Sequence, residues 1–202
     1  MVIFPELRVF QSLIDFQSGK FGLRLASHGY VPIGLDHFAR PDDELAAAAR
    51  TGRLRRNFQG YTTDPADALI GLGASAIGKL PQGFAQNAVD IAGYARAVTQ
   101  GAFATVKGIA VSADDVLRGA IIERLMCDLA VDLAALPAGT PHSAATFAHE
   151  RADLDALAAA GLITIEGSRI TVTEEGRPFV RLVAAAFDAY LPQSRSRHSI
   201  AV

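Results

Sequence analysis

A stripe of apolar residues in the second half of the chain restricts the fold more than any other feature. Leucine or isoleucine recurs at every fourth position after Ser112, at Leu117, Ile121, Leu125, Leu129 and Leu133. This spacing predicts an amphipathic helix, and Ile122 and Met126 widen its apolar face. Asp115 follows Ser112 at the spacing of a capping box, which marks the helix start. A face this wide needs a sizeable surface to pack on, so the chain must contain a hydrophobic core.

The residues after this helix predict a small helix-and-hairpin module. A linker with two prolines and a glycine is expected over 134–141, and a helix over about 144–160, ended by Gly161. Apolar and polar residues then alternate over 162–166 and 169–173, as in two half-buried strands.

Gly167-Ser168 joins these two strands and suits a type II′ turn, with glycine first. Phe179, Val183 and Phe187 predict a last helix that runs to about Leu191. A helix, a hairpin and a second helix in this order are typical of a winged-helix-like module.

The first part of the chain predicts shorter elements. Residues 6–27 have a helical spacing of apolar side chains that is interrupted near Gly19. Tyr30–Leu35 is a short apolar run between glycines, which predicts a buried strand. Pro41–Arg50 has proline first, acids next and alanines inside, which predicts a helix ended by Gly52.

The middle of the chain is rich in glycine. Residues 57–78 predict strand and loop, 86–100 a helix, and 104–112 a strand or an extended connection. Gly71-Leu-Gly-Ala-Ser-Ala76 matches the loose dinucleotide fingerprint, but Ile77-Gly-Lys-Leu-Pro81 behind it is a poor helix start. Close packing of backbone against backbone or a ligand is therefore favoured over a nicotinamide site.

Polar side chains of several kinds follow the predicted strand at Tyr30–Leu35. Asp36 and His37 come directly after it. At the carboxyl end of a strand in an α/β barrel or open sheet, such residues face the active-site mouth. The alternative is a helix cap beside a surface imidazole. Arg55 and Arg56 could hold carboxylates through forked hydrogen bonds, although a solvated face is an equal alternative.

Phe58-Gln59-Gly60-Tyr61 is a second candidate site. An aromatic face, an amide that both donates and accepts, and a glycine that permits close backbone approach suit an adenine or a pyrrole ring. The alternative is a turn with packed aromatic side chains.

Three motifs together resemble one family. They are Gly34-Leu-Asp-His-Phe-Ala-Arg-Pro-Asp-Asp-Glu-Leu45, Arg56-Asn-Phe-Gln-Gly-Tyr-Thr-Thr63 and Gly71-Leu-Gly-Ala-Ser-Ala-Ile77. The combination resembles the later part of oxygen-independent coproporphyrinogen III oxidase, a radical S-adenosylmethionine (SAM) enzyme of haem biosynthesis. The resemblance runs from about Gly29 to the C-terminus.

This resemblance implies an α/β plus α fold. Residues 1–108 would form the last strands of a partial (β/α) radical SAM barrel, and 109–202 a mostly helical C-terminal domain with the winged-helix-like hairpin. In the family, a [4Fe–4S] cluster and SAM generate a radical that starts the oxidative decarboxylation of coproporphyrinogen III to protoporphyrinogen IX. By resemblance, the SAM-binding residues are Phe58, Gln59 and Ile77. Possible substrate or pocket residues are Asp36, His37, Arg40 and Tyr61.

The cysteine count departs from the family. The family holds its cluster with a Cys-x3-Cys-x2-Cys motif, whereas this chain has one cysteine, Cys127, on the predicted apolar-rich helix. A Cys-ligated cluster normally needs three or four thiolates, so we expect no metal on this chain alone. We therefore expect a C-terminal fragment that is inactive alone: a truncated gene, a misplaced start, or half of a split enzyme whose partner chain supplies the missing barrel half.

Composition limits the other functions. The net charge of −2 gives no general attraction to nucleic acid, and no apolar run approaches the roughly 20 residues of a membrane span. A single cysteine and no basic region ahead of an apolar N-terminal stretch predict a cytoplasmic protein. An opened barrel would expose apolar flanks at Tyr30–Leu35 and Leu69–Ala76.

Two alternatives to the enzyme fragment remain. One is a haem- or porphyrin-binding module that has the pocket without the radical chemistry. The other is a winged-helix regulator that binds DNA, although acids outnumber arginine on the helix expected over 144–160.

Overall fold

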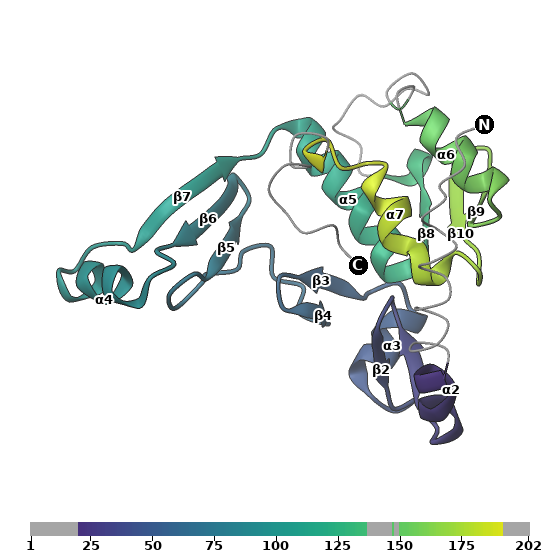
Figure 1. Cartoon of the computed structure of the whole chain (residues 1–202), viewed down its shortest axis with the longest axis horizontal. Coiled ribbons are helices and arrows are strands. Elements are labelled where there is room, and N and C mark those ends of the chain that lie inside the picture. The colour runs from purple at the N-terminus through teal and green to yellow at the C-terminus, as the bar shows by residue number, and fades with distance from the viewer. Residues whose placement is uncertain (1–19, 137–146, 148–149, 192–202) are drawn as a thin grey trace. The chain divides into compact units, whose positions relative to one another are not determined.

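The computed structural model describes residues 20–136, 147 and 150–191 (Figure 1). The chain divides into two compact units. Unit 1 comprises Met1–Thr63 and Leu117–Val202, and unit 2 comprises Asp64–Val116. The division expected after residue 108 follows the domain plan of the family and stays a prediction.

The described part of unit 1 begins with a helix and a short hairpin. The helix α2 (Lys20–Ser27) is followed by the strands β1 (Val31–Ile33) and β2 (His37–Ala39). The predicted strand at Tyr30–Leu35 is confirmed, but it pairs antiparallel with β2, with Ile33 opposite His37. Asp36 and His37 therefore lie in and after a hairpin turn, and the prediction that they end a parallel strand is wrong. Residues 6–19 of the first predicted helix lie outside the described residues.

The helix α3 (Glu44–Arg50) confirms the prediction for Pro41–Arg50, with a later start. The Asp43 side chain accepts a hydrogen bond from the backbone N–H of Leu45 and caps the helix, so Pro41 precedes it. Gly52 has a φ of 65°, which ends the helix as predicted.

A second hairpin follows α3. The strands β3 (Arg55–Asn57) and β4 (Gly60–Thr62) pair antiparallel, with Arg56 opposite Tyr61. Phe58 and Gln59 form the turn between them, so the Phe-Gln-Gly-Tyr motif occupies the tip and one strand of this hairpin.

The C-terminal part of unit 1 combines helices with a three-stranded sheet. Its elements are α5 (Ala113–Asp128), β8 (Ala130–Asp132), η2 (Leu133–Ala135), α6 (Arg151–Ala159), β9 (Ile163–Glu166), β10 (Arg169–Val172), η3 (Arg177–Phe179) and α7 (Val180–Ala185). The sheet has the order β8-β10-β9, and both pairs are antiparallel. The first four residues of α5 belong to unit 2, and the rest to unit 1.

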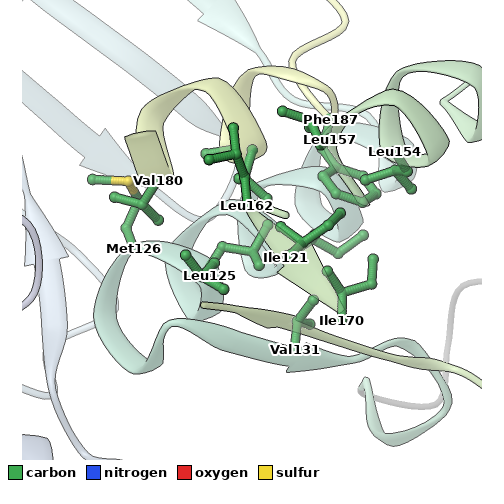
Figure 2. Packing of buried hydrophobic residues seen from close by; sticks show 14 of the residues in the cluster. Ile121, Leu125, Met126, Val131, Leu154, Leu157, Leu162, Ile170, Val180 and Phe187 are labelled. Carbon is green, nitrogen blue, oxygen red and sulfur yellow. The ribbon is translucent and has the colours of Figure 1, made fainter. Parts of the chain in front are cut away.

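The apolar stripe of α5 forms the core as predicted. Ile121 and Leu125 are completely buried and pack with Val131, Ile170 and Phe187 in one cluster, shown close up in Figure 2. The capping box is also confirmed, because the hydroxyl of Ser112 and the carboxylate of Asp115 share hydrogen bonds at the helix start.

Three helix limits differ from the predictions. Helix α5 ends at Asp128, because Leu129 has a φ of 56° and the chain then enters β8. The last helix, α7, ends at Ala185 rather than near Leu191. Helix α6 begins at Arg151, and the predicted helix residues 144–146 and 148–149 lie outside the described part.

The hairpin of β9 and β10 is confirmed. Gly167 has a φ of 61° and Ser168 has no positive φ, as a type II′ turn requires. Gly161 has a φ of 75° and ends α6 as predicted. The predicted linker residues 137–141 lie outside the described residues, and the winged-helix classification stays a prediction.

Unit 2 is a three-stranded antiparallel sheet with one helix. It contains β5 (Ile77–Leu80), β6 (Gly83–Asn87), α4 (Ile91–Thr99) and β7 (Thr105–Ala110), with the sheet order β5-β6-β7. The predicted strand over 104–112 is confirmed. The helix predicted over 86–100 begins only at Ile91, because Gln86 and Asn87 continue β6 and Asp90 caps the helix.

Every strand pair among the described residues is antiparallel. The connections β1–β2, β3–β4, β5–β6 and β9–β10 are too short for parallel pairing, which needs a crossover of a dozen or more residues. The expected end strands of a parallel barrel are therefore not paired as a barrel in this part of the chain. No helix of the described ranges has the length and apolar character of a membrane span.

Candidate functional site

Tyr61 holds two distant segments of unit 1 together. Its hydroxyl accepts a hydrogen bond from the backbone N–H of Leu35 at 3.0 Å and donates one to the carbonyl of Met126 at 3.0 Å. Burial raises the pKa of this hydroxyl, and the Leu35 hydrogen bond partly opposes the rise. Tyr61 therefore stays protonated and ties the β1–β2 turn to the end of α5.

The turn between β1 and β2 is held from a second side. Gly34 has a φ of 55°, and a Cβ placed on it would lie 2.1 Å from the Tyr61 hydroxyl. The Gly34 carbonyl accepts hydrogen bonds from Arg177 Nε and Nη2 at 3.1 and 2.9 Å. Only glycine fits here, and the turn that carries Asp36 is rigidly placed.

Asp36 orients the ring of His37. The Oδ1 atom of Asp36 lies 2.8 Å from Nδ1 of His37. Because an ionised carboxylate only accepts hydrogen bonds, Nδ1 of His37 is the donor in this pair. The ring stands edge-on to Tyr61 with centroids 5.0 Å apart, and the other Asp36 oxygen lies 3.7 Å from Nη2 of Arg181.

Arg56 lies over the ring of Tyr61. Its guanidinium carbon lies 5.7 Å from the centre of the Tyr61 ring, as expected for opposite residues in a hairpin. The neighbouring Arg55 points elsewhere and donates to Glu123 on α5 at 3.1 Å. The interpretation as a solvated face is thus wrong for Arg55, whose guanidinium is half-buried in an ion pair.

Phe58 and Gln59 are exposed at the tip of the same hairpin. Phe58 has 55% of its surface exposed. The backbone N–H of Gln59 donates to the Asn57 side chain at 2.8 Å, which shapes the turn. This tip presents an aromatic ring and an amide side chain on the surface of unit 1.

The structure brings together some of the predicted site residues and leaves others apart. Asp36, His37 and Tyr61 are in contact, and Phe58 and Gln59 lie on the adjoining turn. Arg40 is exposed and pairs with Asp42 at 3.4 Å. Ile77 is half-buried in β5 of unit 2. The assignment of Phe58, Gln59 and Ile77 to SAM stays a prediction.

Sequence reasoning missed Arg177 and Arg181. Both follow the last hairpin, about 140 residues after the turn that they contact, and no local motif marks them. Only the family resemblance, which extends to the C-terminus, could have indicated that this segment reaches the site.

The glycine-rich loop of unit 2 has a packing role. A Cβ on Gly71 would lie 2.9 Å from the backbone of Ile77. The Asn87 side chain donates to the carbonyls of Gly71 and Gly73 at 3.0 Å each. A strand, β5, follows this loop instead of the helix that a dinucleotide site needs, so the packing interpretation is confirmed.

Cys127 is a buried thiol. Its burial, followed by the nearby Glu123 carboxylate, raises the pKa of the Cys127 thiol to about 12. The described ranges contain no group of three His, Cys, Asp or Glu side chains that could hold a metal ion. A cluster therefore does not fit the residues of this part of the chain, since its ligands are thiolates.

Comparison with known proteins gives consistent results. Residues 111–179 match the model of the HemN C-terminal domain. The chain is 47% identical over 178 residues to an oxygen-independent coproporphyrinogen III oxidase of Bradyrhizobium diazoefficiens, a match that covers 88% of this chain and 40% of that protein. It is 42% identical over 170 residues to one of Salmonella typhimurium, covering 84% of this chain and 37% of the relative.

A solved structure agrees. It is described as coproporphyrinogen III oxidase (HemN) from Escherichia coli, a radical SAM enzyme, and matches with a TM-score of 0.75 and 37% identity over 94% of this chain and 42% of that chain. The chain thus spans about two fifths of the length of these relatives.

These matches first define a class: the chain is similar throughout most of its length to radical SAM oxidoreductases. More specifically, it is homologous to oxygen-independent coproporphyrinogen III oxidases and includes the segment that matches their C-terminal domain. The resemblance of the three sequence motifs is confirmed.

Proposed function

We propose that this chain forms the part of an oxygen-independent coproporphyrinogen III oxidase that contacts SAM and the porphyrinogen. On this proposal it serves the oxidative decarboxylation of coproporphyrinogen III to protoporphyrinogen IX, in the cytoplasm. The observation that carries the proposal is the 47% identity over 88% of the chain. The clustering of Asp36, His37 and Tyr61 beside the Phe58 turn supports it, because all four belong to the family motifs.

The radical step needs groups that this chain does not provide. In the proposed enzyme, a [4Fe–4S] cluster would supply the electron for the cleavage of SAM. The one cysteine of the chain is buried and stays a thiol at neutral pH. The cluster ligands must therefore come from further polypeptide, either joined to this sequence or supplied as a separate chain.

The residues of this chain would position the reactants. The exposed Phe58 ring offers a face for stacking, and Gln59 offers an amide that can donate and accept hydrogen bonds. The interior of unit 1 holds the hairpin that carries them, through Tyr61 to Met126 and through Arg55 to Glu123. Barrel strands and a winged-helix-like hairpin are part of this proposal as features of the complete enzyme.

A chimera tests the proposal. Residues 29–202 would replace the matching part of the Escherichia coli enzyme, and the purified chimera would be assayed anaerobically with coproporphyrinogen III, SAM and a reductant. We expect a vinyl product, and a Phe58→Ala/Gln59→Ala chimera should lose at least about tenfold in rate if these residues position SAM. A folded, cluster-loaded chimera without turnover would contradict the proposed function.

The isolated chain gives a second test. After anaerobic reconstitution with iron and sulfide, we expect no absorbance from a four-iron cluster on the 202-residue chain. A stable cluster, or decarboxylation by this chain alone, would show that the assignment of the radical step to further polypeptide is wrong.

The described part of the module favours neither alternative function. For DNA binding, the helix α6 carries Asp153 and Asp155, and its Arg151 is paired with Asp155 at 2.9 Å. For a porphyrin-binding module, the features that would hold the ligand are the same as those of the enzyme. The chimera separates the two, since a binding module would give porphyrin binding without turnover.

A further inference from the structure

We propose that Arg56 and Arg181 form a binding site for an organic carboxylate beside the Tyr61 ring. The proposal rests on the proposed function, because it names the chemistry by which that site would hold its ligand. Two ligands of the proposed reaction carry such a group: the propionate side chains of the tetrapyrrole and the methionine carboxylate of SAM.

The guanidinium of Arg56 has N–H donors that no acidic side chain of the described residues engages. Its guanidinium stacks near Tyr61 at 5.7 Å and makes no ion pair with an acid of the described residues. Its backbone N–H donates a hydrogen bond to Oε1 of Glu123 at 3.2 Å. Other arginines of unit 1 are neutralised: Arg55 lies 3.1 Å from Glu123, and Arg118 lies 2.7 Å from Glu150. The forked donors of Arg56 are therefore available to a carboxylate held over the hairpin.

Arg181 reaches the same cluster from the C-terminal end of unit 1. Its Nη2 atom lies 3.7 Å from Asp36, which is longer than a hydrogen bond, and its side chain is 54% exposed. The shared acceptor Asp36 is already bonded to His37 at 2.8 Å. Arg181 can thus turn its donors toward a second carboxylate without losing a short bond.

The charges of Asp36, Arg56 and Arg181 together favour binding of an anion. Asp36 is one negative charge, and Arg56 and Arg181 are two positive charges, so one positive charge is uncompensated. Arg177 is committed to the Gly34 carbonyl and holds the turn. The Phe58 ring, exposed on the same hairpin, adds an apolar face beside the charged group. A flat or ring-shaped ligand that bears a carboxylate has both features.

A titration of the full 202-residue chain tests this site. Coproporphyrin III, the stable oxidised counterpart of the substrate, is followed by its own absorbance and fluorescence, and SAM by calorimetry. We expect Arg56→Gln to weaken binding of the carboxylate ligand about tenfold and Arg56→Gln/Arg181→Gln further, as for loss of charged hydrogen bonds. Arg56→Lys should recover only part of the affinity, because lysine lacks the fork.

Arg53→Gln is the matched control. It removes one positive charge from a nearby exposed arginine whose Nε donates to the Thr51 hydroxyl, and it should change affinity less than twofold. Loss of coproporphyrin binding alone assigns the site to a propionate, and loss of SAM binding alone assigns it to the methionine carboxylate.

Two results would overturn the proposal. One is equal affinity of the double variant and the unchanged chain for both ligands. The other is the absence of binding of either ligand at millimolar concentration. Neither result decides the proposed function, which is tested separately by the activity of the unchanged chimera.

Discussion

The position of the Asp36–His37 turn depends on the absence of a Cβ atom at Gly34. It combines a positive φ of 55°, a space filled by the Tyr61 hydroxyl and a carbonyl bonded to Arg177. Motif analysis singled out Asp36 and His37, but the structure shows that the glycine before them decides where they lie. A glycine in a sequence motif carries no side chain chemistry, so its role is visible only when its neighbours in space are known.

Gly34→Ala should therefore cost far more than an ordinary glycine change. We expect a loss of about 3 kcal/mol in the free energy of unfolding, from left-handed backbone strain and broken Tyr61 hydrogen bonds. Gly29→Ala is the control: its φ is 83° but its Cβ would meet nothing within 4 Å, so only the strain of about 1 kcal/mol remains. Urea denaturation measures both, and equal losses would refute the steric role of Tyr61.

Cys127 gives a prediction in pH. The folded-state pKa of about 12 exceeds the ordinary thiol value of 9.0, so the stabilising contribution of the buried thiol is complete below pH 9 and is lost as the pH rises from 9 toward 12. Over this range the unfolded chain releases the proton first. Unfolding free energy should fall more steeply in the unchanged chain than in Cys127→Ala, by at most about 1.4 kcal/mol per pH unit. Parallel slopes in urea denaturation series would contradict the buried-thiol assignment.

At the scale of elements, helix α5 connects the core to the site. Its apolar face forms the main core, and the Glu123 side chain and the Met126 carbonyl accept hydrogen bonds from the β3–β4 hairpin. The period of four in the sequence was enough to predict the helix and its buried face. The polar contacts of the opposite face could not be predicted, because their partners come from segments about 70 residues earlier.

The strands β1 and β2 illustrate the other limit of sequence reasoning. A short apolar run predicted β1, but the run does not specify the neighbour of the strand. The connection of three residues between Ile33 and His37 forces an antiparallel hairpin. The expected exposure of Tyr30–Leu35 is also wrong for Ile33, which is 1% exposed, because α3 and Leu54 cover it in a second small core.

The pair of Arg118 on α5 and Glu150 before α6 predicts a large change in stability. Both side chains are largely buried, and the second carboxylate oxygen of Glu150 has no partner in the described ranges. Arg118→Met should cost about 3–5 kcal/mol, because it leaves a buried charge unpaired.

The control for this pair is Arg151→Gln. Arg151 and Asp155 form an exposed pair on α6, and removing it should cost about 0.5 kcal/mol or less. The double variant Arg118→Met/Glu150→Leu should recover most of the stability lost by Arg118→Met. If the double variant is as unstable as the single one, the loss does not come from the unpaired carboxylate.

At the scale of the whole molecule, the two units differ in how they are stabilised. Both clusters of buried apolar residues in the described part belong to unit 1. In unit 2, α4 has no buried residue and β7 is exposed along its length. Phe103, Leu72 and Ile91 are 96%, 84% and 78% exposed. The expected exposure near Leu69–Ala76 is thus found at Leu72.

This difference predicts unequal hydrogen exchange. Amides of β5, β6 and β7 should exchange with much lower protection than those of α5, because few apolar contacts oppose local opening of unit 2. Exchange followed by mass spectrometry on peptides from the two units measures this. Equal protection in β6 and in the centre of α5 would mean that unit 2 has a stabilising contribution that these buried residues do not reveal.

The hydrogen bonds from Arg177 to the carbonyl of Gly34 span 143 positions of the chain. During synthesis on the ribosome, the first hairpin emerges long before the side chain that completes its turn. The turn at Gly34 therefore lacks these two hydrogen bonds until Arg177 has left the exit tunnel. Long-range closure of this kind slows folding, and the emergence of Arg177, rather than that of the hairpin, sets the moment at which the turn carrying Asp36 and His37 is completed.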